Sequence, residues 1–357
     1  MRAPAAADDA ALRGVYPGDM TTTAVTLSLS LSLSLALALA ACSKQPAAPP
    51  GDKASPAPSA PASVAAASSS AAPAAADAPD AGGIAPLASV PLPAGAASCG
   101  ADKEPACYRF ASARDAFVWV AAHDPKVLAI GEAHAQKGTE GIASSTKRFT
   151  EDLLPVIAPR ASDLLLELWL GDPRCKREVA AVASAQKPVV QKQAKSNPNE
   201  FIQLGDRAKA LGVQPHVLRP TCDDYADLAD AGADAVPKML SLIRRLSTVD
   251  ARSYLDRNAA RAPSKMVVLY GGALHNDASP PESSRDWSFG PDLIRETGGR
   301  YVELDLIVPE FVKKTPVWEK LPWYAAWAAD EGAPKDKATL YRVGERSFAL
   351  IFPRTTK

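Results

Sequence analysis

KVLAIGEAH at residues 126–134 and MVVLYGGALH at residues 266–275 share one organisation: an apolar run, then glycine, then histidine. Each apolar run is typical of a buried strand. Glycine allows a tight turn where a larger residue would clash. Ligands in open α/β sheets bind beyond the carboxyl ends of strands. The chain has four histidines, so finding two of them at such ends predicts that His134 and His275 share one cleft.

Apolar runs and helical patterns alternate around these two stretches. The runs predict strands at 126–130, 163–168, 213–218, 266–270, 301–308 and 347–352. The periodic segments predict helices at 109–123, 139–157, 196–212, 223–247 and 250–262, with Pro155 ending the second early and Pro237 interrupting the fourth. This alternation predicts an α/β fold with a mostly parallel central sheet and helices on both faces. The carboxy-terminal strands are expected to add antiparallel edges.

The amino end, residues 1–41, is predicted to be a lipoprotein-type signal peptide. Residues 21–41 are uncharged and rich in Leu and Ala, and small residues stand directly before Cys42. A retained membrane-spanning anchor is the alternative, because the length suits one. The segment resembles a bacterial lipoprotein signal, which implies a Cys42 acylated with palmitate. The expected location is the bacterial cell envelope, lipid-anchored at the outer membrane or its periplasmic face.

Residues 42–95 consist mainly of Pro, Ala, Ser and Gly. Such a segment buries too little apolar surface to offset chain ordering, so we expect a disordered, semi-extended linker. Residues 96–357 are long enough for the predicted α/β domain. The chain carries 40 basic and 40 acidic residues and no basic stripe, so we expect no nucleic-acid partner. The expected partners are a small-molecule or peptide substrate and the membrane, and the oligomeric state stays open.

Four cysteines remain in the domain: Cys99, Cys107, Cys175 and Cys222. An even set in an exported protein favours disulfides. Four cysteines allow three connectivities, and the short separation favours Cys99–Cys107, which leaves Cys175–Cys222. A metal–thiolate site is the alternative, but no Cys-x-x-Cys spacing supports it.

Four polar side chains near the strand ends are candidates for chemistry. Glu132 and His134 are two residues apart, so in an extended segment they project to the same side. Glu167 lies within an apolar run, where a carboxylate is costly unless it is paired, protonated or bound to a cation. With His275, these residues are a reasonable ligand set for Mn, Co or Zn with bound water. A histidine activating water without metal is a second possibility, and purely structural hydrogen bonding is a third.

LAIGEAH at 128–134, LLLE at 164–167 and YGGALH at 270–275 resemble the superfamily that unites erythromycin esterases, ChaN-like haem-binding lipoproteins, and the Tiki and TraB proteins. The resemblance implies an α/β fold whose active-site set is Glu132, His134, Glu167 and His275. Glu140 resembles a glutamate that follows the first motif in the esterase branch. The alternative for Glu140 is a solvent-facing carboxylate in the first turn of a helix.

The branches of this superfamily imply different functions. One is hydrolysis of ester or amide bonds, metal-dependent or through His and Glu. The alternative is a haem-binding iron-uptake lipoprotein without catalysis, and a third is a scaffold without activity. ChaN-like members usually carry another histidine soon after the first motif, whereas the next one here is His216.

A few further residues have two interpretations. Arg219, Asp223, Asp224 and Tyr225 follow the strand 213–218 and are candidate contacts for substrate anions or haem, or ordinary capping and surface charges. We expect His123 at the surface of a helix end and His216 in the core. Four tryptophans wall an apolar pocket or pack the core: Trp287, Trp318, Trp323 and Trp327.

Overall fold

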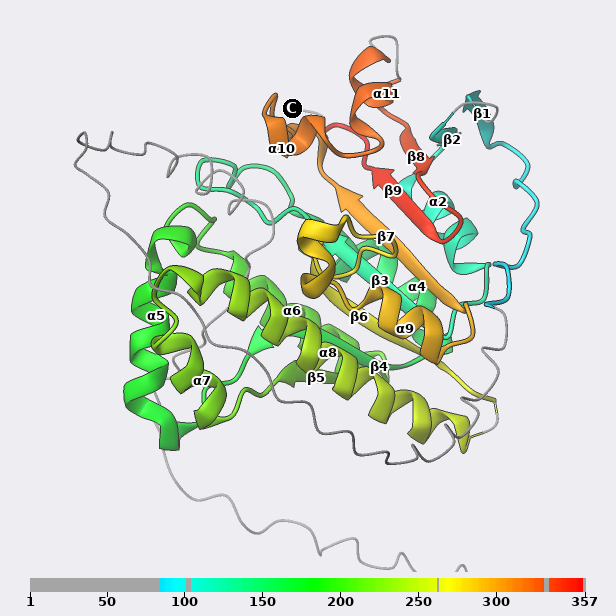
Figure 1. Cartoon of the computed structure of the whole chain (residues 1–357). Helices are drawn as coiled ribbons and strands as arrows, with labels where there is room; N and C mark the ends of the chain where they lie inside the picture. The colour runs from blue at the N-terminus through cyan, green and yellow to red at the C-terminus, as the bar shows by residue number, and fades with distance from the viewer. Residues whose placement is uncertain (1–83, 101–103, 262, 331–333, 356–357) are drawn as a thin grey trace, which may run out of the picture.

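A computed structural model describes residues 84–100, 104–261, 263–330 and 334–355 (Figure 1). The predicted signal peptide, Cys42 and most of the predicted linker lie outside the described residues. Each helix within the described residues is too short or too polar to cross a bilayer.

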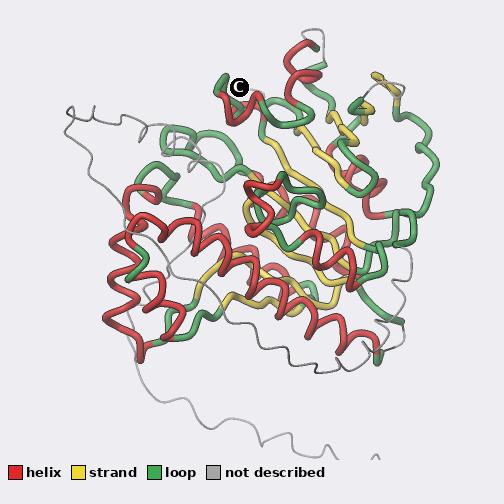
Figure 2. Tube along the Cα trace, viewed as in Figure 1, coloured by secondary structure: helices red, strands yellow, loops and turns green. Residues whose placement is uncertain are grey.

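The described strands form a mixed nine-stranded sheet in the order β1-β2-β8-β9-β7-β3-β6-β4-β5 (Figure 2). The six strands from β9 to β5 pair in parallel, whereas β8, β2 and β1 continue the sheet in antiparallel pairing. The predicted α/β class is therefore confirmed. Among the described carboxy-terminal strands, the predicted antiparallel pairing is found only between β8 and β9, because β7 and β9 pair in parallel and the outer strands β1 and β2 come from the amino-terminal part of the domain. The bounds are β1 Ala97–Gly100, β2 Ala106–Phe110, β3 Val127–Glu132, β4 Ala161–Trp169, β5 Gln214–Leu218, β6 Met266–Gly272, β7 Tyr301–Ile307, β8 Ala338–Arg342 and β9 Ser347–Ile351.

Helices cover both faces of this sheet. In Figure 1, α8 and α9 lie in front of the strands, and α10 and α11 lie beyond the ends of β7 and β9. The bounds are α2 Ala113–Ala121, α3 Ser145–Arg148, α4 Leu154–Ile157, α5 Lys176–Val190, α6 Asn197–Ala210, α7 Cys222–Ala229, α8 Ala235–Ala259, α9 Gly290–Glu296, α10 Pro316–Glu319 and α11 Tyr324–Ala329.

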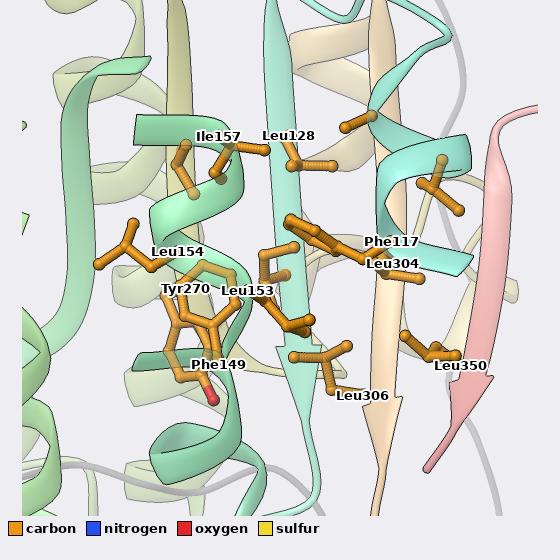
Figure 3. Close-up of a cluster of buried hydrophobic side chains, with 14 of the residues drawn as sticks. Phe117, Leu128, Phe149, Leu153, Leu154, Ile157, Tyr270, Leu304, Leu306 and Leu350 are labelled. Carbon is orange, nitrogen blue, oxygen red and sulfur yellow. The ribbon is translucent and has the colours of Figure 1, made fainter. Parts of the chain in front are cut away.

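The central strand β3 is buried on both sides, which explains its unbroken apolar sequence. Leu128 and Ile130 belong to the core under α2, α4 and α6. Val127 and Ala129 belong to the core under α7, α8 and α9. Figure 3 shows part of the first core, where Phe149 lies against Tyr270. Their ring centroids are 4.9 Å apart.

Two predicted helices differ from the observed ones. The helix predicted at 139–157 begins only at Ser145, where the Ser144 hydroxyl accepts a hydrogen bond from the N–H of Lys147. It then continues through Pro155, because a π-helical segment, Phe149–Leu153, shifts the hydrogen-bond register before the proline. The prediction that Pro155 ends this helix is therefore wrong.

The helices predicted at 223–247 and 250–262 have different bounds. α7 ends at Ala229, and α8 then runs without a break from Ala235 to Ala259. Pro237 lies in the first turn of α8, where a backbone N–H would have no acceptor within the helix. The proline therefore costs α8 no hydrogen bond. At the amino end, Arg109 belongs to β2, and α2 begins after the cap Ser112.

Both predicted disulfides are present. Cys99–Cys107 joins β1 to β2, and Cys175–Cys222 joins the turn before α5 to the first residue of α7. The second bridge closes 47 residues and holds together two helices that pack against each other. Both cross-links restrict the unfolded chain and so stabilise the fold.

Candidate functional site

The two histidine motifs reach the same edge of the sheet. β3 and β6 are parallel neighbours in which Glu132 is paired with Gly272, and β4 lies on the other side of β6. The side chains of Glu132 and Glu167 nevertheless lie on opposite faces. Glu132 contacts Tyr270 in the first core, whereas Glu167 follows Leu165 into the second. The predicted set therefore forms two histidine–glutamate pairs with β6 between them.

The first pair is Glu132 and His134, both 2% exposed. The His134 Nδ1 lies 2.5 Å from Glu132 Oε1. The other oxygen, Oε2, accepts hydrogen bonds from the Tyr270 hydroxyl at 2.6 Å and the Thr146 hydroxyl at 2.7 Å. Because a carboxylate only accepts, the His134 proton sits on Nδ1 and the neutral ring is basic at Nε2. The sequence argument missed Tyr270 and Thr146, whose roles depend on contacts across the fold.

These contacts shift both pKa values. Burial raises the pKa of Glu132, but the charge of His134 and the three hydrogen bonds lower it more, so the net pKa lies below the ordinary value. Burial lowers the pKa of His134, but the charge of Glu132 and its hydrogen bond outweigh burial, and Glu167 adds to this, so the net pKa is raised. The pair therefore favours a charged carboxylate that stabilises an imidazolium.

His134 borders a cavity of about 420 Å³. The other lining residues are Ala133, Gln136, Lys137, Gln191, Lys192, Phe311, Lys313, Thr315 and Trp318. Three lysines and two aromatic residues thus line the cavity together with His134. Its size is within the range of small-molecule sites.

The second pair, Glu167 and His275, is enclosed. Glu167 Oε2 accepts from the Gly272 N–H at 2.6 Å, and His275 Nδ1 donates to the Trp287 carbonyl at 2.8 Å. The remaining atoms, Glu167 Oε1 and His275 Nε2, face each other at 3.6 Å. Neither has a hydrogen-bond partner among the described residues, and the same holds for Asn276 Oδ1. These residues border a space of only about 10 Å³.

A divalent metal fits the second pair better than the first. His275 donates its Nδ1 proton to a carbonyl, as metal-bound histidines usually do, which leaves Nε2 facing the carboxylate. Glu132 and His134 instead satisfy each other. Across the described residues, the one group of three His, Cys, Asp or Glu with closely spaced ligand atoms is Asp172, Cys175 and Cys222, whose cysteines are in a disulfide. A four-residue shell from Glu132, His134, Glu167 and His275 is therefore not assembled.

Two glycines of the motifs serve close packing rather than tight turns. β3 continues through Gly131 and β6 continues through Gly271. A Cβ on Gly271 would lie 2.4 Å from Glu167 Oε2, and one on Gly131 would lie 2.3 Å from Asp305 Oδ1. The predicted turn at each glycine is therefore wrong, because polar side chains lie directly over the strand backbone there.

A second acidic group was missed by the sequence argument. Glu303 and Asp305 alternate in β7 and face the second core together with Asp277 and Asn276. Burial raises the pKa of Asp305 to about 7 and raises that of Glu303 well above its ordinary value. The sequence did contain a sign of this group. YVELDLI at 301–307 places two carboxylates within an apolar strand, in the same way that DLLLEL at 163–168 places Glu167.

Other candidate residues lie away from both pairs. Glu140 is exposed in a loop ahead of α3, where it accepts from the Gly138 N–H, so it is not in the first turn of a helix. Tyr225 is fully buried against Trp169. Arg219 instead borders a separate cavity of about 550 Å³ beside His216. The two residues proposed for a cofactor are thus not brought together in one pocket.

His123 is buried, with Nδ1 close to the carbonyls of Trp119 and Val120, so its predicted surface position is wrong. His216 is half-buried and pairs with Asp163 at 2.8 Å. Among the tryptophans, Trp318 borders the His134 cavity and Trp323 is buried in the apolar cluster under α10 and α11. The Trp287 carbonyl binds His275, and Trp327 borders a third cavity.

A comparison with protein-family models, curated proteins and solved structures finds no match to this chain. The superfamily resemblance noted above therefore stays a prediction, and the function has to be argued from the site.

Proposed function

We propose that this protein is a hydrolase of ester or amide bonds in which His134, held by Glu132, activates water. The observation that carries the proposal is a buried, fully hydrogen-bonded glutamate that fixes an imidazole at the border of a substrate-sized cavity.

The chemistry follows from the tautomer. Neutral His134 holds its proton on Nδ1 against Glu132 and accepts a proton from water at Nε2 as the water oxygen attacks the substrate carbonyl. The imidazolium that forms is stabilised by the ionised Glu132. It then returns the proton to the leaving alcohol or amine, as the histidine of a catalytic triad does.

A divalent Mn, Co or Zn ion belongs to the proposal through the second pair. Glu167 and His275 would hold it, and Asn276, whose amide oxygen has no hydrogen-bond partner among the described residues, lines the same small space. Such an ion supplies positive charge at the same edge of the sheet. Glu167 already influences His134 electrostatically, so occupancy of the second pair would change the basicity of the first.

We also propose the cell envelope as the location, with a lipid on Cys42. The composition of residues 21–42 supports an export signal. Two disulfides suit an oxidising compartment. Labelling with a fatty-acid probe should disappear in Cys42→Ala, and labelling that persists would contradict the lipid anchor.

The hydrolase proposal is tested with a panel of chromogenic esters and anilides, with and without added Mn²⁺, Co²⁺ or Zn²⁺. We expect turnover in the wild type, loss in His134→Gln and retention in His216→Gln, which alters a histidine–carboxylate pair elsewhere. Equal activity of the first variant and the wild type would refute the proposal. A sharpened Soret band on adding haem, together with no turnover, would favour the carrier alternative.

A further inference from the structure

We infer that the His134 cavity selects an anionic substrate, one that carries a carboxylate or phosphate group near the scissile bond and an apolar portion next to it. This inference rests on the proposed hydrolase function and specifies its substrate class. It is carried by charges and surfaces that the catalytic pair itself does not use.

Three lysines border the cavity: Lys137, Lys192 and Lys313. The described residues that line it include no aspartate or glutamate. Within the described part of the chain, Lys147 is the one lysine in an ion pair, with Glu151 at 3.9 Å, so the three cavity lysines lack such a partner. In a chain with equal numbers of acidic and basic residues, this local excess of positive charge attracts anions.

Backbone hydrogen bonds join two of the segments that carry these lysines. The N–H of Lys137 donates to the Lys192 carbonyl at 3.0 Å, and the N–H of Ala194 donates to the Ala135 carbonyl at 2.9 Å. The segment after the His134 motif therefore pairs with the segment after α5, and Lys137 and Lys192 lie on these two neighbouring segments. Lys313 comes from a third segment, shortly after the turn that follows β7.

The lining also includes two aromatic residues, Phe311 and Trp318. Phe311 is 2% exposed and Trp318 is 6% exposed, so both rings are held by the fold rather than lying loose in solvent. Glu140 interacts electrostatically with Lys137 but is outside the lining. A substrate with an anionic group and a hydrocarbon part matches a lining that combines lysines with aromatic rings.

The test compares p-nitrophenyl hemisuccinate with neutral p-nitrophenyl butyrate. We expect a lower KM for the anionic ester, with a preference that fades as NaCl is raised. Each of Lys137→Gln, Lys192→Gln and Lys313→Gln should raise the KM of the anionic ester about fivefold and leave kcat and the neutral ester unchanged. Lys314→Gln and Lys195→Gln, on the same segments but outside the lining, should change neither. Equal KM for the two esters, or no effect of the three cavity substitutions, would overturn the inference.

A binding measurement separates this inference from the hydrolase proposal. Calorimetry with glutarate and with phenyl phosphate on His134→Gln asks whether the cavity binds anions when the proposed base is absent. We expect binding that is lost in the triple lysine variant and kept in Lys314→Gln, and the tighter of the two ligands identifies the anionic group. Absence of binding to both would refute the anionic site, whereas binding without any ester turnover in the wild type would refute only the hydrolase.

Discussion

The Glu132–His134 pair and the Glu167–His275 pair contain the same residue types at one edge of one sheet, but they differ in hydrogen bonding and access. Glu132 accepts from three side-chain donors, and His134 borders an open cavity. Glu167 accepts from one backbone N–H, and its second oxygen faces His275 Nε2 in an enclosed space. The first environment supports proton transfer with a substrate. In the second, a bound cation or water would supply the partner that Glu167 Oε1 and His275 Nε2 lack among the described residues.

In these two pairs the partners of the carboxylate decide its chemistry more than the spacing of the motif does. Tyr270 belongs to the second motif by sequence, yet its hydroxyl serves the first pair. Strand alternation separates the pairs, because β6 carries Tyr270 on one face and Leu269 on the other. The two pairs are therefore expected to respond differently to the same kinds of substitution.

The largest expected effect is on catalysis at the open pair. His134→Gln removes the proposed base and should lower kcat/KM by roughly 10²–10⁴-fold. Steady-state kinetics with the best ester substrate measures this, and circular dichroism verifies the fold. A loss of less than threefold would remove His134 from the mechanism.

Glu132→Gln should change the pH dependence as well as the rate. The charge of Glu132 raises the pKa of His134 against the effect of burial, so its removal lowers that pKa. Because the neutral imidazole is the base, the acidic limb of the kcat/KM profile should move to lower pH. The plateau should fall roughly tenfold or more, since the ring loses its orienting partner. A limb that stays in place or moves to higher pH would contradict the assigned role of Glu132.

The enclosed pair should respond to steric change. Gly271→Ala places a Cβ against Glu167 and should reduce the free energy of unfolding by about 1–3 kcal/mol. Gly141→Ala is the matched control, because a Cβ there meets no atom within 4 Å. Urea unfolding compares the two variants. Equal stability would show that Glu167 does not pack on the strand as described.

The smallest expected effect is a cation-dependent gain in stability. Mn²⁺, Co²⁺ or Zn²⁺ at about ten times its Kd should add about 1.4 kcal/mol of folding free energy, seen as a Tm a few degrees higher. Glu167→Gln and His275→Ala should abolish the shift, while His134→Gln should keep it. The reverse pattern would assign the ion to the open pair.

Much of the fold follows from local pattern. Strands buried on both faces appear as apolar runs, so β3, β4 and β6 were predicted within two residues of their observed bounds. The antiparallel strands β1, β2 and β8 were not, because short mixed sequences such as ATLYR become strands through pairing with distant partners.

The candidate site was predicted only in part. Residue types and strand ends indicated Glu132, His134, Glu167 and His275, and the structure brings them to one edge of the sheet. Their division between two faces was implicit in the alternation of β4, where Glu167 shares a face with Leu165. Lys192 and Lys313, which border the cavity, and Thr146, which donates to Glu132, come from other segments of the chain, so the sequence around His134 carries no sign of them.

The most direct test is a nitrogen-15 NMR titration of the four histidine rings, assigned with His134→Gln and His275→Ala. We expect His134 to carry its proton on Nδ1 when neutral and to titrate above an ordinary histidine because of Glu132. A His134 ring that titrates at or below the ordinary value, or that carries its neutral proton on Nε2, would contradict the account.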